Sequence, residues 1–163
     1  MSYIPNISSC AVKAAGVLTY MVQCGCITHC ALEYIGHIIM CTGSSMEPTI
    51  YSNDILLTER ITPRFQRIKK GDIIIAKSPS DPQIYICKRV TGMPGDTALV
   101  GFSSQVVPRG HVWLEGDNHS NSTDSRIFGP VPQGLIHARA LCRIWPPKDI
   151  KMLTCKERQV ITR

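Results

Sequence analysis

Positive charge is scarce at the start of this 163-residue chain, and its scarcity argues against two kinds of leader. No arginine precedes Arg60, whereas a mitochondrial transit peptide is rich in arginine. Only one lysine, Lys13, stands before the uncharged run over 14–32, which is long for a secretory signal. We therefore expect neither a transit peptide nor a cleaved signal here.

Charged residues are also few overall, at 18%, whereas apolar residues make up 44% of the chain. This balance excludes a disordered acidic or basic tail protein. No internal repeat is present, and the length is sufficient to bury a core, so we expect one compact domain with one appended element. The formal net charge of +6 lies entirely after residue 41. Because the basic residues are not interleaved with aromatic ones, this charge favours contact with anionic lipid head groups over nucleic acid.

The eight cysteines lack the paired CxxC spacing of a zinc site. Cys26, His29 and Cys30 would share one helical face, which makes a metal site conceivable. Small soft side chains in an apolar helix are the preferred interpretation, so we expect no metal and no cofactor. The spacing assigns no disulfide. Five of the eight cysteines lie in the first 41 residues, at Cys10, Cys24, Cys26, Cys30 and Cys41.

The uncharged run over 14–32 predicts the appended element. As a helix it would be about 28 Å long, close to the thickness of the hydrocarbon core of a bilayer. Lys13 and Glu33 bracket the run, as the ends of a membrane-spanning helix would at the two interfaces. We therefore predict a transmembrane anchor helix within segment 1–33. A buried or amphipathic helix is the alternative, because polar side chains dilute the run at Thr19, Gln23, Thr28 and His29.

Beyond residue 33 the pattern changes to short apolar runs separated by glycine and proline, which is typical of strands joined by tight turns. These runs predict a mainly β domain over 34–146, followed by a basic tail over 147–163. The expected strands cover 34–40, 54–58, 73–77, 84–90, 111–115 and 137–145.

Residues 43–49 could carry a nucleophile. Pro48 holds the residue before it extended, and Gly43 permits an unusual turn, so a serine between them can point outward. Backbone N–H groups can converge beside such a serine, as an oxyanion site requires. Ser44 and Ser45 are the candidates. Turns of this composition are common, so an inert surface turn is the alternative.

The predicted strand over 84–90 places a lysine on an apolar face. Alternation puts Ile84, Ile86, Lys88 and Val90 on the same side. Burial there would disfavour the charged ammonium and lower the pKa of Lys88, which would make its amine a usable general base. The alternative is a lysine whose stem covers apolar surface while its amine reaches water. None of the five histidines offers an obvious Ser–His–Asp triad.

A polar segment over 116–126 follows a predicted strand. Asp124 and Arg126 are two residues apart and could form an ion pair that fixes this loop. Ser122 could hydrogen-bond to a nearby lysine. The alternative is a solvated turn or an N-glycosylation acceptor, because the segment contains two Asn-X-Ser/Thr sequences.

The chain carries SSMEPT at 44–49, YICKRVTGMPGD at 85–96 and GDNHSNSTDSRIFGPV at 116–131. Together and in this order, these segments resemble the nucleophile box, the lysine box and the last box of the type I signal peptidase family. The resemblance covers about 34–146, and the segments GDIIIAKSPSDP and GHVWLEGDN are similar to its mitochondrial branch. It implies a signal-peptidase-like, or LexA-like, β domain behind the N-terminal helix.

The resemblance also implies a role for each residue that matches a box. Ser45 matches the nucleophile, Lys88 the general base, and Ser122 the hydroxyl that orients the lysine. Asp124 and Arg126 match a structural ion pair. The backbone N–H of Ser45 matches one donor to the oxyanion.

Two features depart from the family pattern. Several bacterial members supply a second oxyanion donor from a hydroxyl two residues before the nucleophile, and this chain has Gly43 there. We expect a backbone group to serve instead, with Gly43 and Ser44 forming the oxyanion side of the site. The stretch 97–109 is short for the family, which would trim a hairpin.

The resemblance implies a membrane-anchored serine endopeptidase that needs no cofactor. In the mitochondrial branch, such enzymes remove N-terminal sorting sequences from precursor proteins at the inner membrane. Their catalytic domain faces the intermembrane space, and they act with a second peptidase subunit. A non-catalytic, membrane-anchored subunit is one alternative, supported by Gly43 and the short 97–109 stretch. A self-cleaving Ser/Lys regulator is another, although 1–33 is too short and too apolar for the DNA-binding domain that it would need.

Overall fold

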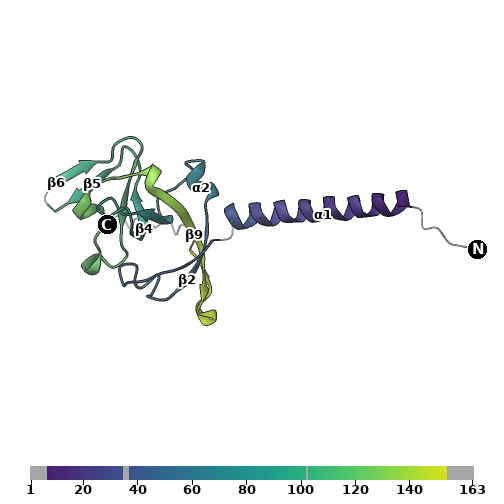
Figure 1. Cartoon of the computed structure of the whole chain (residues 1–163). Helices are drawn as coiled ribbons and strands as arrows, with labels where there is room; N and C mark the ends of the chain where they lie inside the picture. Colours follow the sequence, from purple (N-terminus) through teal and green to yellow (C-terminus); the bar gives the residue numbers. More distant parts are fainter. Residues whose placement is uncertain (1–6, 35–36, 102, 154–163) are drawn as a thin grey trace, which may run out of the picture.

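The computed structural model describes residues 7–34, 37–101 and 103–153, and it shows one long helix followed by a β domain (Figure 1). The helix, α1 (Ile7–Tyr34), extends away from the domain (Figure 1). An ion pair ties its foot to the domain, with Arg60 donating to the Glu33 carboxylate at 3.0 Å. The helix predicted over 14–32 is therefore present.

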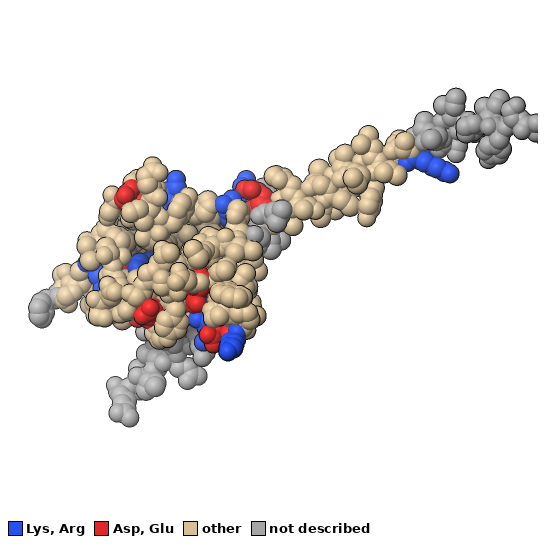
Figure 2. Space-filling view, turned by 60° about the horizontal axis from the view of Figure 1, so that its bottom comes forward, with Lys and Arg blue, Asp and Glu red and all other residues tan. Residues whose placement is uncertain are grey.

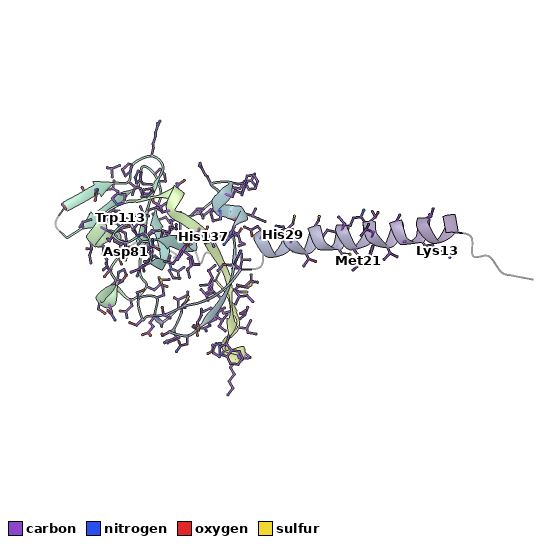
Figure 3. All side chains as sticks on the ribbon, viewed as in Figure 1. Lys13, Met21, His29, Asp81, Trp113 and His137 are labelled. Carbon is purple, nitrogen blue, oxygen red and sulfur yellow. The ribbon has the colours of Figure 1, made fainter. Side chains whose placement is uncertain are left out.

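The surface of α1 carries no Lys, Arg, Asp or Glu between Lys13 and Glu33. On the face drawn in Figure 2, charged side chains gather on the β domain and near the two ends of the helix. Figure 3 shows Met21 and His29 along the helix between Lys13 and the domain. Large apolar side chains are exposed along α1 at Val12, Val17, Leu18, Tyr20, Met21, Val22 and Ile27.

Within the described residues, no helix combines the length and the hydropathy that a membrane crossing demands. The prediction of a transmembrane anchor over 14–32 therefore fails for this part of the chain, although the helix itself forms. The physical reason is the set of polar side chains within the run, Gln23, Thr28 and His29 among them, which lowers its mean hydropathy.

The domain is built on one curled antiparallel sheet, which confirms the mainly β prediction (Figure 1). The strand order is β1-β2-β9-β3-β4-β7-β8, and β10 pairs with β9. Each of the six predicted runs corresponds to one strand, although residues 35 and 36 of the first run lie outside the described residues. The strands are β1 (His37–Met40), β2 (Ile55–Glu59), β3 (Ile73–Lys77), β4 (Tyr85–Gly92), β7 (His111–Glu115), β8 (Val131–Pro132), β9 (Ile136–Trp145) and β10 (Lys151–Met152).

Strand β3 lies inside the sheet and is buried on both faces, which explains its uninterrupted apolar run. Ile73 and Ile75 belong to one core cluster, whereas Ile74 and Ala76 belong to the other. Because side chains alternate along a strand, β3 joins the two clusters. Met46, from the predicted nucleophile segment, is buried in the first of them. The core therefore fixes the segment that carries Ser44 and Ser45.

A separate hairpin fills the stretch that the sequence suggested was trimmed. Its strands are β5 (Thr97–Val100) and β6 (Ser103–Val106), which pair only with each other among the described strands. Exposed and half-buried residues alternate on β5, and every residue of β6 is exposed. The sequence therefore had no strong apolar pattern from which these two strands could be predicted. The remaining elements are short helical turns: α2 (Ile61–Arg64), η1 (His119–Asn121), α3 (Ser125–Phe128), η2 (Gln133–Leu135) and η3 (Pro147–Asp149).

The boundary predicted at residue 146 needs correction. Residues 147–153 belong to the domain, because β10 pairs with β9 and Leu153 is buried in the first core cluster. The guanidinium of Arg143 also donates to the Asp149 carbonyl oxygen at 2.9 Å. Strand β10 is only two residues long, and many of the residues that surround Leu153 are distant in the sequence, so composition alone indicated only a basic tail. Residues 154–163 of that predicted tail lie outside the described residues.

The central position of β3 makes a direct prediction about stability. Replacing the fully buried Ile74 by Ala should cost about 2–5 kcal/mol, because it removes packing from one core cluster and leaves a cavity. Ile38→Ala is the matched control, because Ile38 on β1 is 65% exposed. Urea unfolding of both variants measures the difference. Equal losses in the two variants would contradict the assignment of β3 as the centre of the core.

Candidate active site

Two buried side chains anchor the segment that follows β1. Met46 and Ile50 are 3% and 1% exposed, and the Met46 carbonyl accepts hydrogen bonds from the Thr49 and Ile50 amides. Gly43 has φ +95°, a conformation that favours glycine over any residue with a Cβ. The chain therefore turns sharply at Gly43 and presents Ser45, half-buried, directly before the anchored Met46.

The loop after β7 clamps the serine segment from the other side. The Asn118 amide donates to the Ser45 carbonyl at 3.0 Å, and the Asn118 side chain donates to the Ser44 carbonyl at 3.1 Å. The Asn121 side chain donates to the Ser44 hydroxyl at 2.7 Å. A Cβ on Gly116 would collide with both the Ser122 hydroxyl and the Ser45 carbonyl. Two segments far apart in sequence therefore meet at the serine through backbone contact.

The Lys88 side chain lies in the interior, as alternation along the strand predicted. Lys88 is 4% exposed, and its amine donates to the Ser122 hydroxyl at 3.0 Å. The Ser122 hydroxyl in turn donates to Asp124 Oδ2 at 2.7 Å. The amine therefore faces a hydroxyl whose hydrogen already points to a carboxylate, so an oxygen lone pair is available to it.

Asp124 is the buried end of this network. Its carboxylate accepts from Arg126 Nε at 2.9 Å, from Arg126 Nη2 at 2.8 Å and from the Gly116 amide at 3.0 Å. Burial raises the pKa of Asp124, but the hydrogen bonds from Arg126, Gly116 and Ser122 outweigh it and lower that pKa to about 2. The ionised carboxylate therefore stabilises the fold above about pH 4, and this contribution is lost as the pH falls towards 2.

The pKa of Lys88 is lowered from that of a free lysine. Burial is the largest cause, because it removes water from the ammonium. The negative charge of Asp124 opposes the shift, whereas the positive charge of Arg126 adds to it. The ion pair formed by Asp124 and Arg126 therefore leaves burial as the dominant influence, and the neutral amine is more accessible than in solvent.

Ser45 and Lys88 line the same cavity, which has a volume of about 110 Å³. Its other lining residues come from the segment after β1 and from the first half of β4: Cys41, Thr42, Gly43, Met46, Ile50, Tyr85, Ile86 and Cys87. A larger hollow of about 350 Å³ lies at the foot of α1, around Arg60 and His137, and no predicted site residue lines it. The chemistry of the predicted residues therefore belongs to the smaller cavity.

Gly43 occupies a different setting from the other predicted residues. Its amide donates to the Ser52 hydroxyl at 3.3 Å, on the exposed side of the turn. The Ser44 hydroxyl is engaged by Asn121, as described above. The structure thus brings Ser45, Lys88, Ser122, Asp124 and Arg126 into one connected region, with Gly43 and Ser44 on its rim.

Sequence patterns did not indicate the residues that hold the serine segment and the loop after β7 together. Arg89 donates to both carboxylate oxygens of Asp117, at 2.8 and 2.7 Å, and to the Gly71 carbonyl at 2.9 Å. Asn118 and Asn121 were read only as turn or glycosylation residues. Their contacts to the serine segment span more than seventy residues, and no local pattern in the sequence encodes them.

The comparisons with known proteins show which family the chain resembles. The profile of the family described as signal peptidase, peptidase S26, matches residues 14–101 and 97–145. Mitochondrial inner membrane protease subunit 1 of Mus musculus is 53% identical over 147 residues, covering 86% of this chain and 89% of that protein. The Homo sapiens protein of the same name is 52% identical with the same coverage. Subunit 2 of Danio rerio is 40% identical over 129 residues, covering 74% of this chain and 70% of that protein.

The buried amine makes a prediction about stability and pH. Lys88→Met should stabilise the fold at about pH 6, because the wild-type protein must there bury an ammonium that the unfolded chain leaves in water. As the pH rises through the lowered pKa, the folded lysine becomes neutral before the unfolded one. Wild-type stability then rises, and the advantage of the variant shrinks by about pH 9. Urea unfolding at both pH values measures it.

Lys77→Met is the matched control, because Lys77 ends the neighbouring strand β3 and is exposed. Its stability should follow that of the wild-type protein at both pH values. A wild-type protein more stable than Lys88→Met throughout would show that the amine is not desolvated.

Proposed function

The chain belongs to the signal peptidase family, peptidase S26, as its motifs predict, and we propose on this basis that it is a serine endopeptidase of the mitochondrial inner membrane. It removes N-terminal sorting sequences from precursor proteins. Ser45 is its nucleophile and Lys88 its general base. The names of the relatives, mitochondrial inner membrane protease subunit 1, support the location and the reaction class.

The burial of the Lys88 amine in the cavity of Ser45 carries this proposal. A lysine that merely covered apolar surface would send its amine to water, but Lys88 is 4% exposed and bonded to Ser122. The ion pair between Asp124 and Arg126 is placed behind Ser122, where it fixes the hydroxyl. Such an arrangement gives a general base a defined position and a lowered pKa.

The first chemical step is proton transfer from Ser45 to neutral Lys88. The Ser45 oxygen then attacks the scissile carbonyl and forms an acyl-enzyme with the precursor. The Lys88 ammonium gives its proton to the leaving amine and becomes neutral again. Water then hydrolyses the acyl-enzyme with Lys88 as the base, which restores Ser45.

The oxyanion formed in these steps needs donors beside Ser45. The Ser45 amide is one such donor, because it lies at the turn that the Asn118 contacts hold in place. The amide of Gly43 is directed to Ser52. A second donor from the Gly43–Ser44 turn therefore requires a small rotation when substrate binds.

The substrate binds as an extended strand along the first half of β4. Among the described pairings, β7 meets β4 only from Arg89 onward, so the edge of 85–88 that faces away from β3 is open to a peptide. This edge runs directly into the cavity of Ser45 and Lys88. A volume of about 110 Å³, walled by Met46 and Ile50, suits a small side chain next to the cleaved bond.

The enzyme works with a second peptidase subunit, and its β domain faces the intermembrane space. The naming of relatives as subunits 1 and 2 of one protease supports a complex. Residues 42–163 carry the whole net charge of +6, which favours the approach of this part of the chain to anionic lipid head groups at the membrane surface.

Removal of the nucleophile tests the reaction. Ser45→Ala should abolish cleavage of a mitochondrial precursor while leaving the unfolding midpoint near that of the wild-type protein, because only one oxygen is lost. Ser104→Ala on the exposed strand β6 is the matched control and should cleave normally. Gel analysis of precursor processing, with the second subunit present, measures both. Full cleavage by Ser45→Ala would end the nucleophile assignment, and a wild-type protein that never cleaves would favour a non-catalytic subunit.

The dependence of kcat/KM on pH tests the base. The pKa that this profile reports for the base should lie below about 10.4, the value of a solvated lysine, because burial lowers the pKa of Lys88. Asp124→Asn should lower this pKa further, because the negative charge of the carboxylate opposes the lowering in the wild-type protein. Initial rates with a peptide substrate across the pH range give the pKa for both proteins. A wild-type pKa near that of free lysine would be incompatible with a desolvated base.

A further inference from the structure

Two cysteines meet in the cavity of Ser45 and Lys88, and the proposed mechanism uses neither. Cys41 directly follows β1 and is 8% exposed. Cys87 lies on β4 directly before Lys88, is half-buried, and packs against the core cluster that contains Cys41. Both thiols are free, so the cavity contains a reduced cysteine pair beside its nucleophile and base.

The two thiols line one cavity, where Cys87 packs against the core cluster that contains Cys41. Hydrogen bonding with Cys87 lowers the pKa of Cys41, and hydrogen bonding with Cys41, together with burial, raises the pKa of Cys87. Cys41 is therefore the thiol that ionises first, and a thiolate is the form that reacts with disulfides.

The contact between the thiols depends on the curl of the sheet. In the strand order, β1 stands at one end and β4 beyond β2, β9 and β3, so no strand pairing brings Cys41 to Cys87. The curl closes this gap at the mouth of the cavity. A covalent bond between the two sulfurs would therefore tie the segment before the nucleophile to the strand that carries the base.

We propose that Cys41 and Cys87 are an oxidation site that forms a reversible disulfide across the substrate cavity and closes it. The oxidant is a small-molecule disulfide such as glutathione disulfide. The Cys41 thiolate attacks one of its sulfurs and releases one thiolate, which takes up the proton that Cys41 had lost. The Cys87 sulfur then attacks the Cys41 sulfur of the mixed disulfide and releases the second thiolate, which takes up the Cys87 proton. Two protein thiols are thus oxidised and one disulfide is reduced to two thiols.

Closure of the cavity follows from the length of the bond. A disulfide brings its sulfurs to about 2.05 Å, well inside the contact distance of two thiols. The two walls of a cavity of about 110 Å³ must therefore move together. Lys88 adjoins Cys87 in the chain, so the base moves with the wall. A displacement of about 1 Å between reacting groups costs on the order of a hundredfold in rate.

Peptide mapping tests the bond itself and needs no enzyme activity. The full chain is treated with glutathione disulfide or with dithiothreitol, its free thiols are alkylated, and it is cut after glutamate. Cleavage after Glu33 and Glu59 gives a peptide with Cys41 as its one cysteine, because the bond between Glu47 and Pro48 is not cut, and cleavage after Glu59 and Glu115 gives one with Cys87. We expect these two peptides to be linked after oxidation and separately alkylated after reduction. Separate alkylation after both treatments, or links to other cysteines instead, would overturn the proposal.

Activity tests the closure, which rests on the proposed function. The ratio of oxidised to reduced cleavage rate should fall on the order of a hundredfold in the wild-type protein and recover with dithiothreitol. In Cys41→Ser the ratio should stay near one, whatever the rate of the reduced variant, because no mixed disulfide can form at the thiol that reacts first. Cys142→Ser is the matched control, because Cys142 is a half-buried cysteine on β9 outside the cavity, and its ratio should fall as in the wild type.

These experiments distinguish a failure of the proposed closure from a failure of the proposed function. Linked peptides with an unchanged cleavage rate would overturn the closure while leaving the oxidation site in place. A reduced protein that cleaves no precursor would refute the proposed function, and the peptide map would still decide whether the thiols pair. A ratio that falls equally in Cys41→Ser would assign the loss to cysteines outside this pair, such as Cys24, Cys26 and Cys30 on α1, and would refute the proposal.

Discussion

The burial of one amine is the constraint on which the rest of the site depends. An ammonium without water is costly, so Lys88 can lie at 4% exposure only if it is neutral or well bonded. The structure meets this condition with one hydroxyl, Ser122, backed by the carboxylate of Asp124. The positive charge of Arg126 then offsets the negative charge of that carboxylate. The network therefore fixes the position of the Lys88 amine more than it stabilises the charged form of the amine. Buried groups of this kind lower stability in exchange for reactivity, which is common at catalytic sites.

Two loops must meet for this network to face the serine, and their meeting depends on the absence of a side chain. Gly116 touches both Ser122 and the Ser45 carbonyl, so any Cβ there would force the loops apart. Asn118 then joins the two backbones with two hydrogen bonds. The segment after β1 and the first half of β4 meet around the cavity, and Asn118 ties the loop after β7 to that segment. The fold therefore determines the distance between nucleophile and base, and local sequence only supplies the groups.

Local periodicity could predict the strands and the face of Lys88, because alternation along a strand depends on neighbouring residues only. The apolar run of β3 likewise indicated a strand, and the structure shows that this strand is buried on both faces. Contacts between segments far apart in the chain could not be predicted from local patterns. The hydrogen bonds of Asn118 and Asn121 to Ser44 were missed for this reason. The pairing of β10 with β9 is local but was missed, because β10 is two exposed residues long and has no apolar alternation. Length and charge predicted the helix over 14–32 but overstated its hydropathy, because absence of charge is a weaker condition than apolarity.

The thiol pair and the buried amine occupy one cavity, and their charges are linked. A thiolate at Cys87 would raise the pKa of Lys88, because it would stabilise the ammonium. The pKa of Cys87 is itself raised, so this thiol stays protonated and neutral in the reduced protein. A disulfide is also uncharged, so its formation leaves the charge beside Lys88 unchanged. Any loss of activity on oxidation must therefore come from the narrowed cavity and not from a changed protonation state of the base.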